Sequence, residues 1–246
     1  LRQSLERIRA EAEDAVRSGA GHLVLTDQHQ GESRVGMPMI LATSAVHSWL
    51  TRKGLRTFTS LNVRSAECID PHYFAVLIGC GATTVNAYLA QDSIADRMRR
   101  GLIDSSLEDA LRRYREAIDA GLLKIMSKMG ISVISSYRGG LNFEAIGLSR
   151  ALVDEFFPGL TSRISGVGLA GIAFEEVDKH RTAYDETLTA LPVGSFYRYR
   201  ARGERHALEA DSIHQLQKAC DTGDYVAHKK YADKVRERRL REPIQL

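Results

Sequence analysis

Apolar residues recur at helical spacing over the first eighteen positions of the chain. They lie three or four residues apart, at Leu1, Leu5, Ile8, Ala12, Ala15 and Val16. This periodicity predicts an amphipathic helix that ends at Gly19. The short apolar run over 22–26 (HLVLT) then predicts a buried strand, and the polar stretch over 27–38 predicts a loop.

The same alternation of helix and strand patterns continues along the chain. Expected helices cover 39–53, 71–79 and 106–120, and expected strands cover 57–63, 83–88, 132–137 and 143–146. Asp70 before Pro71, and Ser105 with Glu108, provide capping signals. Short strands separated by helices predict parallel strands with crossover helices. We therefore predict an α/β fold, an incomplete or barrel-like (βα) domain with parallel strands, because only four or five such units are visible. A doubly wound sheet is the alternative.

The residue composition of the sequence changes near Thr187. We predict a central α/β domain over 1–190 and a helical connector over 191–246. Within the connector, 191–202 is rich in aromatic and arginine residues and is expected to be extended. Asp211 and Asp224 are expected to cap its two helices, over 212–220 and 225–240.

The amino-acid composition argues against a nucleic-acid-binding, membrane-spanning or disulfide-linked protein. The 246 residues are 43% hydrophobic and carry a net charge of +3 with acids and bases interspersed, which does not favour a nucleic-acid partner. Apolar runs are too short for a membrane span. The cysteines Cys68, Cys80 and Cys220 lie far apart, without a metal or disulfide pattern, and indicate a reduced, cytoplasmic setting. A helix that begins at Leu1, without an initiating Met, suggests a piece of a longer chain.

Several polar and basic side chains are candidates for a channel or an interface. They are Ser60, Asn62, Asn86, Tyr88, Ser135 and Ser136 in or beside expected strands, Lys124 and Lys128 four residues apart, and Arg138 after the strand expected over 132–137. The strand side chains suit either a polar conduit or hydrogen-bonded barrel interior. The two lysines could bind an anion or an acidic domain, or they could simply lie in solvent at the end of a helix, where the helix dipole favours cations. Arg138 suits an anion, a domain contact, or an ion pair with Glu144.

The remaining motifs do not define a catalytic site. Gly166, Gly168 and Gly171 match G-x-G-x-x-G, but the context favours a strand-to-helix turn over a dinucleotide loop. The eight histidines form no ligand cluster, and no G-x-S-x-G, H-E-x-x-H or P-loop occurs. We therefore predict no catalytic, cofactor-binding or metal-binding residue in this chain.

Four motifs occur in order between residues 124 and 169. They are KIMSKMGIS (Lys124–Ser132), SYRG (Ser136–Gly139), FEAIGL (Phe143–Leu148) and SRISGVGL (Ser162–Leu169). Together they resemble the central region of the glutamate synthase large subunit. The likeness extends over essentially the whole chain, from LRQSLERIRAEAEDAVRSGAGHLVLTDQ at its start to GDYVAHKKYADKV near its end.

The resemblance implies a role within a multidomain oxidoreductase. In that family an amidotransferase domain releases ammonia from glutamine, and the ammonia passes through a channel to a flavin barrel. There it adds to 2-oxoglutarate, and reduced FMN completes a second glutamate. Electrons come from a nicotinamide cofactor or ferredoxin through iron–sulfur centres. The chain is expected to bridge the two sites and to contribute to the channel.

The same resemblance implies the partners and cofactors of the full-length subunit. The expected partners are the amidotransferase and flavin domains of the same polypeptide, with a reductase subunit or ferredoxin as electron donor, and neither nucleic acid nor membrane. FMN and a 3Fe-4S cluster are expected outside this chain. The alternatives are a self-sufficient flavin-binding α/β barrel oxidoreductase and a non-catalytic interaction module.

Overall fold

The structure is a computed structural model that describes residues 1–190, 193–195 and 198–243. The chain divides into two compact units, Leu1–Tyr184 and Asp185–Leu246. The first unit is a mixed α/β unit with two small parallel sheets, and its described strands do not close a barrel. This confirms the predicted fold class. The boundary predicted between residues 190 and 191 stays a prediction.

Three parallel strands form the first sheet in the order β1-β2-β3. Their bounds are β1 His22–Thr26, β2 Ser60–Arg64 and β3 Thr84–Asn86. The strand expected over 22–26 is confirmed, but its predicted burial is wrong, because its side chains alternate between exposed and half-buried and Val24 is 62% exposed. The strand expected over 57–63 begins later, because a 3-10 turn covers Arg56–Phe58, and the strand expected over 83–88 is shorter. Leu61 and Val63 point into the core from β2, the central strand.

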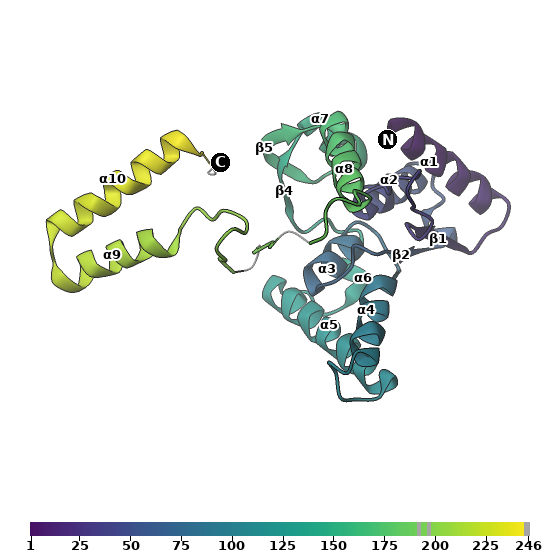
Figure 1. Ribbon diagram of the computed structural model, residues 1–246. Coiled ribbons are helices and arrows are strands. Elements are labelled where there is room, and N and C mark those ends of the chain that lie inside the picture. The colour runs from purple at the N-terminus through teal and green to yellow at the C-terminus, as the bar shows by residue number, and fades with distance from the viewer. Residues whose placement is uncertain (191–192, 196–197, 244–246) are drawn as a thin grey trace. The chain divides into compact units, whose positions relative to one another are not determined.

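Three helices supply most of the core beside this sheet. They are α1 (Arg2–Arg17), α2 (Met39–Arg52) and α3 (Pro71–Gly79). Helices α1 and α2 lie side by side (Figure 1), and Leu5 of α1 is fully buried in the same cluster as Ala45 of α2. All three helices confirm the predictions. The Asp70 carboxylate caps α3 by accepting hydrogen bonds from the backbone amides of His72 and Tyr73, at 2.9 and 3.1 Å.

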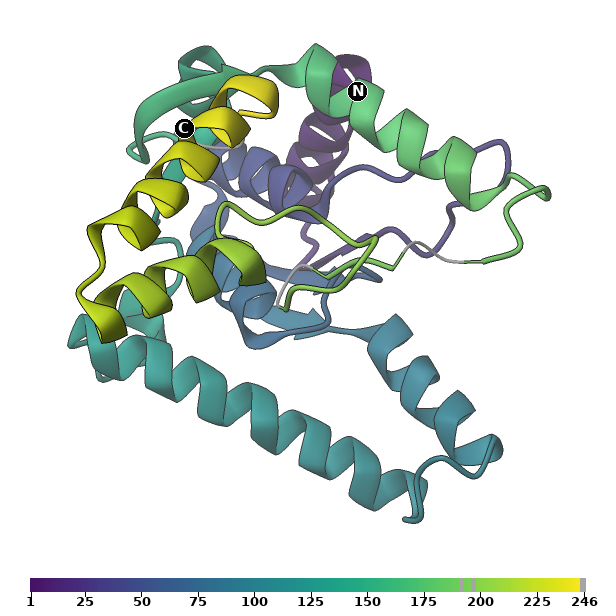
Figure 2. The same ribbon diagram turned by 60° about the vertical axis from the view of Figure 1, so that its left-hand side comes forward.

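Two further helices follow β3, and the sequence predicted only the second. They are α4 (Tyr88–Arg99) and α5 (Leu107–Met129), joined by a loop (Figure 2). The α5 helix is longer than expected and is capped by Ser106 rather than Ser105. The Ser106 hydroxyl accepts from the Asp109 amide at 3.1 Å. Gly121 does not end the helix but allows close packing, since a Cβ there would lie 2.6 Å from Pro71.

The strand predicted over 132–137 is wrong. Residues Ile134–Tyr137 form the short helix α6 instead. This segment pairs with none of the described strands, and the backbone that follows it bonds to the end of α3: the Gly139 amide donates to the Ile78 carbonyl at 3.0 Å. Only Tyr137 is buried, whereas Val133 is 52% exposed. β-branched residues favour a strand only when pairing and burial support it.

Two parallel strands form a second, separate sheet. Strands β4 (Glu144–Leu148) and β5 (Thr161–Val167) are joined through α7 (Arg150–Phe156), and α8 (Leu169–Ala183) follows β5. The expected strand over 143–146 is confirmed with a small shift. Gly168 caps α8, so the glycine motif is the strand-to-helix turn that we predicted. Gly166 is needed because a Cβ would lie 2.3 Å from the Gly147 carbonyl oxygen.

The second unit contains two helices, α9 (Ala210–Thr222) and α10 (Tyr225–Arg241), which pack against each other. Asp224 caps α10, with its carboxylate accepting from the Val226 amide at 2.8 Å. The predicted cap at Asp211 is wrong, because Asp211 lies inside the first turn of α9. Of the extended segment predicted over 191–202, residues 191–192 and 196–197 lie outside the described residues.

Candidate functional site

The first sheet has one buried face and one polar face. Side chains alternate along each strand, so the residues that do not point into the core share the other face. The polar face comprises His22, Val24, Thr26, Ser60, Asn62, Arg64, Thr84 and Asn86. These side chains are exposed or half-buried. Three predicted candidates, Ser60, Asn62 and Asn86, therefore lie on one surface.

A chain of hydrogen bonds crosses this polar face from strand to strand. His22 Nδ1 and the Ser60 hydroxyl are 2.6 Å apart, and Asn62 Nδ2 donates to the same hydroxyl at 3.1 Å. The Thr84 hydroxyl donates to Asn62 Oδ1 at 2.6 Å. The parallel register makes these contacts possible, because it sets Asn62 opposite both Val24 and Thr84. The polar side chains are thus both hydrogen-bonded to one another and accessible.

Tyr88 lies beyond the carboxyl end of β3, at the first position of α4. The guanidinium of Arg64 lies 5.2 Å from the centre of its ring. Burial and a hydrogen bond to Asp27 raise the pKa of Tyr88 to about 12, so its hydroxyl stays protonated. Asp27 also accepts hydrogen bonds from the Ser65 hydroxyl and the Ala66 amide, each at 2.9 Å. The Asp27 carboxylate therefore links β1 to the residues that follow β2 and β3 at the carboxyl edge of the sheet.

Four other candidates lie elsewhere on the first unit. Lys124 and Lys128 are exposed on the last turns of α5, and their spacing places them on one side of the helix. Ser135 and Ser136 are exposed on α6 rather than in a strand. None of the four belongs to the polar face or lines the two pockets described next. Their proposed role in an interface stays a prediction.

Arg138 lines an open pocket of about 570 Å³ at the amino-terminal edge of the first sheet. We call this the amino-edge pocket; its lining is Gly21, His47, Arg56, Thr57, Phe58, Thr59, Ser60, Thr83 and Arg138. The expectation that Arg138 follows a strand, at a carboxyl edge, is wrong, because the preceding segment is α6. Glu144 does not pair with Arg138 either; it lies 3.6 Å from Arg163.

Arg56 is anchored in this pocket by neutral acceptors. Its Nε donates to His47 Nδ1 at 3.0 Å, and its two terminal nitrogens donate to the carbonyls of Thr59 and Gly81, at 2.6 and 2.8 Å. Because His47 Nδ1 accepts this bond, the imidazole is neutral. Burial, and then the charges of Arg56 and Arg138, lower the pKa of His47 to about 4.

Glycines make room for the His47 ring. A Cβ at Gly81 would lie 2.2 Å from His47 Nδ1, and a Cβ at Gly139 would lie 3.1 Å from Nε2. Both glycines also have positive φ, of +111° and +72°. Sequence analysis singled out Arg138 but missed His47 and Arg56. No spacing signal marks those two, since they come from a helix and a turn that meet only in the folded unit.

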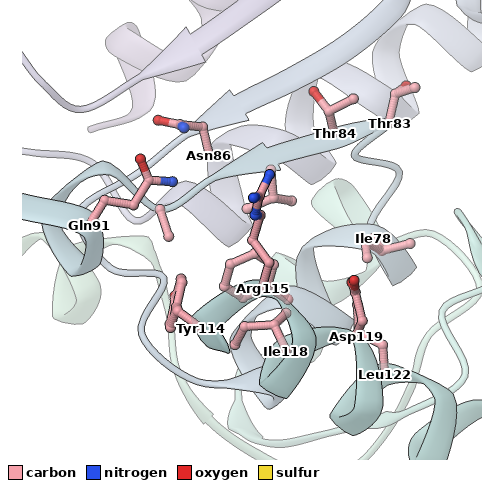
Figure 3. A pocket seen from close by; sticks show the side chains of 13 residues that line it. Ile78, Thr83, Thr84, Asn86, Gln91, Tyr114, Arg115, Ile118, Asp119 and Leu122 are labelled. Carbon is pink, nitrogen blue, oxygen red and sulfur yellow. The ribbon is translucent and has the colours of Figure 1, made fainter. Parts of the chain in front are cut away.

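A second pocket, of about 460 Å³, follows the outer side of β3 (Figure 3). Strand β3 contributes Thr84 and Asn86, and α5 contributes Arg115 and Asp119. Figure 3 shows the Arg115 side chain reaching from α5 toward β3. Asn86 therefore belongs to both the polar face and this pocket, which sequence analysis did not anticipate.

The described residues offer no ready metal site. No group of three or more His, Cys, Asp or Glu side chains converges within the parts of the chain that the structure describes. Burial raises the pKa of the Cys68 and Cys80 thiols to about 12, which keeps both protonated at neutral pH. No helix of the described chain is both long and apolar enough to cross a membrane.

The family model and the similar proteins all point to the same enzyme family. The family model of the glutamate synthase central domain matches residues 1–149. The chain is 62% identical over 247 residues to the NADPH glutamate synthase large chain of Azospirillum brasilense, and 41% identical over 241 residues to that of Bacillus subtilis. These alignments cover 100% and 98% of this chain, but only 16% of each relative.

A relative named for a different electron donor is also similar. The NADH glutamate synthase of Saccharomyces cerevisiae is 34% identical over 247 residues, which cover 95% of this chain and 12% of that protein. The chain thus spans about a sixth of the length of the first two curated relatives that it matches.

Proposed function

Because this chain belongs to the glutamate synthase central domain family, we propose that it acts as an internal domain of a glutamate synthase large chain. The enzyme would convert glutamine, 2-oxoglutarate and a reductant into two molecules of glutamate. In this role the chain bridges the amidotransferase and flavin domains and forms part of the wall of the ammonia channel. The relatives support this function and give no support to a self-sufficient flavin enzyme.

The observation that carries the channel assignment is the hydrogen-bonded polar face. Parallel sheets in α/β proteins are usually covered on both faces, whereas here one face presents polar and exposed side chains. Ser, Thr and Asn side chains can donate to and accept from ammonia without carrying a charge. The polar face contains no Asp or Glu, so it offers no carboxylate that would hold ammonium as an ion pair.

The cofactors and partners belong to the same proposal. FMN, the 3Fe-4S cluster and the glutamine-hydrolysing site lie in other domains of the polypeptide, and the electrons come from a reductase subunit or ferredoxin. The segment over 191–246 serves as the connector toward the flavin domain. The whole enzyme works in the cytoplasm. The family and the small share of each relative that this chain covers support the other domains and their cofactors, and the three unpaired cysteines support the cytoplasmic setting.

The test is Asn62→Leu in the complete large chain, assembled with its electron donor. This change removes the bonds to Ser60 and Thr84 and makes the centre of the polar face apolar. We expect the ratio of glutamine hydrolysed to 2-oxoglutarate consumed to rise about twofold or more, because ammonia is lost before it reacts. Synthesis from added ammonium salts, measured at saturation, should change little.

A matched control is Asn142→Leu, which makes the same chemical change at an exposed asparagine outside the polar face. It should leave the ratio unchanged. If Asn62→Leu also leaves the ratio unchanged while the enzyme stays folded, the polar face does not line the channel. The family assignment would then stand, and the channel assignment would be abandoned.

A further inference from the structure

Among the described residues, the lining of the amino-edge pocket includes two arginines and no carboxylate. Arg56 and Arg138 both line the pocket. Burial is the larger cause that lowers the pKa of Arg56, and the positive charge of Arg138 lowers it further. The pKa of His47 is lowered by burial and by the charges of Arg56 and Arg138, and no described Asp or Glu lines the pocket to offset them. Like charges in a partly buried setting repel each other, so a nearby anion would stabilise this arrangement.

The charge on Arg56 is positioned but not neutralised. Its acceptors are His47 Nδ1, backbone carbonyls and the Thr83 hydroxyl, all of which are uncharged. Among the described residues, Arg56 forms no ion pair. Buried or half-buried charges in proteins are normally matched by an opposite charge. A guanidinium held rigidly by four neutral acceptors therefore indicates a site prepared for an anion from outside the unit.

Arg138 provides the second guanidinium group of the pocket. Its side chain is exposed and, within the described chain, makes no hydrogen bond and no ion pair. Its guanidinium fork can bind two oxygens of one planar or tetrahedral oxyanion. Thr57 also lines the pocket and carries a hydroxyl, whereas the hydroxyls of Thr59 and Ser60 already donate to the carbonyls of Ser60 and Gly21. His47 stays uncharged at neutral pH and holds Arg56 in place.

We propose that the amino-edge pocket binds an oxyanion, a carboxylate or phosphate group, between Arg56 and Arg138. The pocket volume of about 570 Å³ accommodates a small free anion or the end of an acidic side chain from elsewhere in the longer polypeptide. Both sources present the same chemistry to the two guanidinium groups. The proposal concerns anion binding alone and does not depend on the channel assignment.

The first measurement is a titration of the 246-residue chain with inorganic phosphate at constant ionic strength, with chloride as the replaced anion. The readout is the ¹H–¹⁵N signal of the arginine Nε–H groups, assigned with Arg138→Lys. We expect a saturable shift of the Arg138 signal. Arg138→Gln should weaken phosphate binding about tenfold or more. The matched control Arg113→Gln removes an exposed arginine of α5 that lies outside the pocket, and it should leave binding unchanged.

The second measurement identifies the source of the anion, with the complete large chain. If phosphate raises the thermal midpoint of the large chain, and Arg138→Gln abolishes that rise, the occupant is a free anion. If phosphate has no effect but Arg138→Gln lowers the midpoint more than Arg113→Gln does, the occupant is a carboxylate of the same polypeptide.

The proposal is overturned by any of three results. The first is a linear, unsaturable response of the 246-residue chain to phosphate. The second is equal weakening of binding by Arg138→Gln and Arg113→Gln. The third is a large chain that neither responds to phosphate nor depends on Arg138.

Discussion

Protonation of His47 should make the first unit less stable as the pH falls. The imidazole is neutral in the folded unit because it accepts a hydrogen bond from Arg56 and is largely buried beside two arginines. Its pKa is lowered from 6.5 to about 4 on folding. Between these two values the unfolded chain binds a proton that the folded chain does not bind. Stability is therefore complete above about pH 6.5 and decreases as the pH falls toward 4.

The size of this effect follows from the two pKa values. Between pH 7 and pH 5 the linkage relation gives a loss of about 2 kcal/mol from this single histidine. Ending at pH 5 limits the contribution of carboxylates, which titrate mainly at lower pH. The loss is a large fraction of the stability of an ordinary domain, so it is measurable.

Trp49 provides the assay, because it is the only tryptophan and lies on α2, the helix that carries His47. Urea unfolding followed by its fluorescence at pH 7, 6 and 5 gives the free energy of unfolding of the first unit. His47→Gln should remove the loss between pH 7 and pH 5, whatever its effect at pH 7. His72→Gln, at an exposed histidine on α3, should retain the loss. Equal slopes for the wild type and His47→Gln would refute the neutral, buried histidine.

Three further expectations concern packing and domain organisation. Glu155→Ala should lower the free energy of unfolding by about 2–3 kcal/mol, because it leaves the buried guanidinium of Arg9 without its carboxylate. In the same urea assay, Glu11→Ala removes an exposed ion pair within α1 and should lower the free energy of unfolding by less than about 0.5 kcal/mol. Gly166→Ala should cost about 2 kcal/mol or more, since its Cβ would clash with the backbone of β4, and thermal unfolding that matches the wild type would contradict this contact. Limited proteolysis should cleave within 191–246 before it cleaves the α/β unit, and mass spectrometry of the first fragments identifies the cut.

Local signals in the sequence were sufficient for several elements. The apolar spacing from Leu5 to Val16 identifies α1, because a helix face needs only neighbours three and four residues away. The Asp70 cap before Pro71 likewise identifies the start of α3, because the carboxylate bonds to amides two and three residues further on. The candidates Ser60 and Asn62 could be grouped in advance, since alternation along one strand places them on one face.

Tertiary structure alone decided the features that depend on distant partners. Residues 132–137 have the composition of a strand but pair with none of the described strands, and Ile134–Tyr137 form α6 instead. The hydrogen bonds that link His22 to Ser60, and Asn62 to both Ser60 and Thr84, require the register of three strands. The amino-edge pocket unites side chains from α2, the turn before β2 and the end of α6. Sequence spacing carries no information about contacts between such distant residues, because long-range packing of the whole unit sets them.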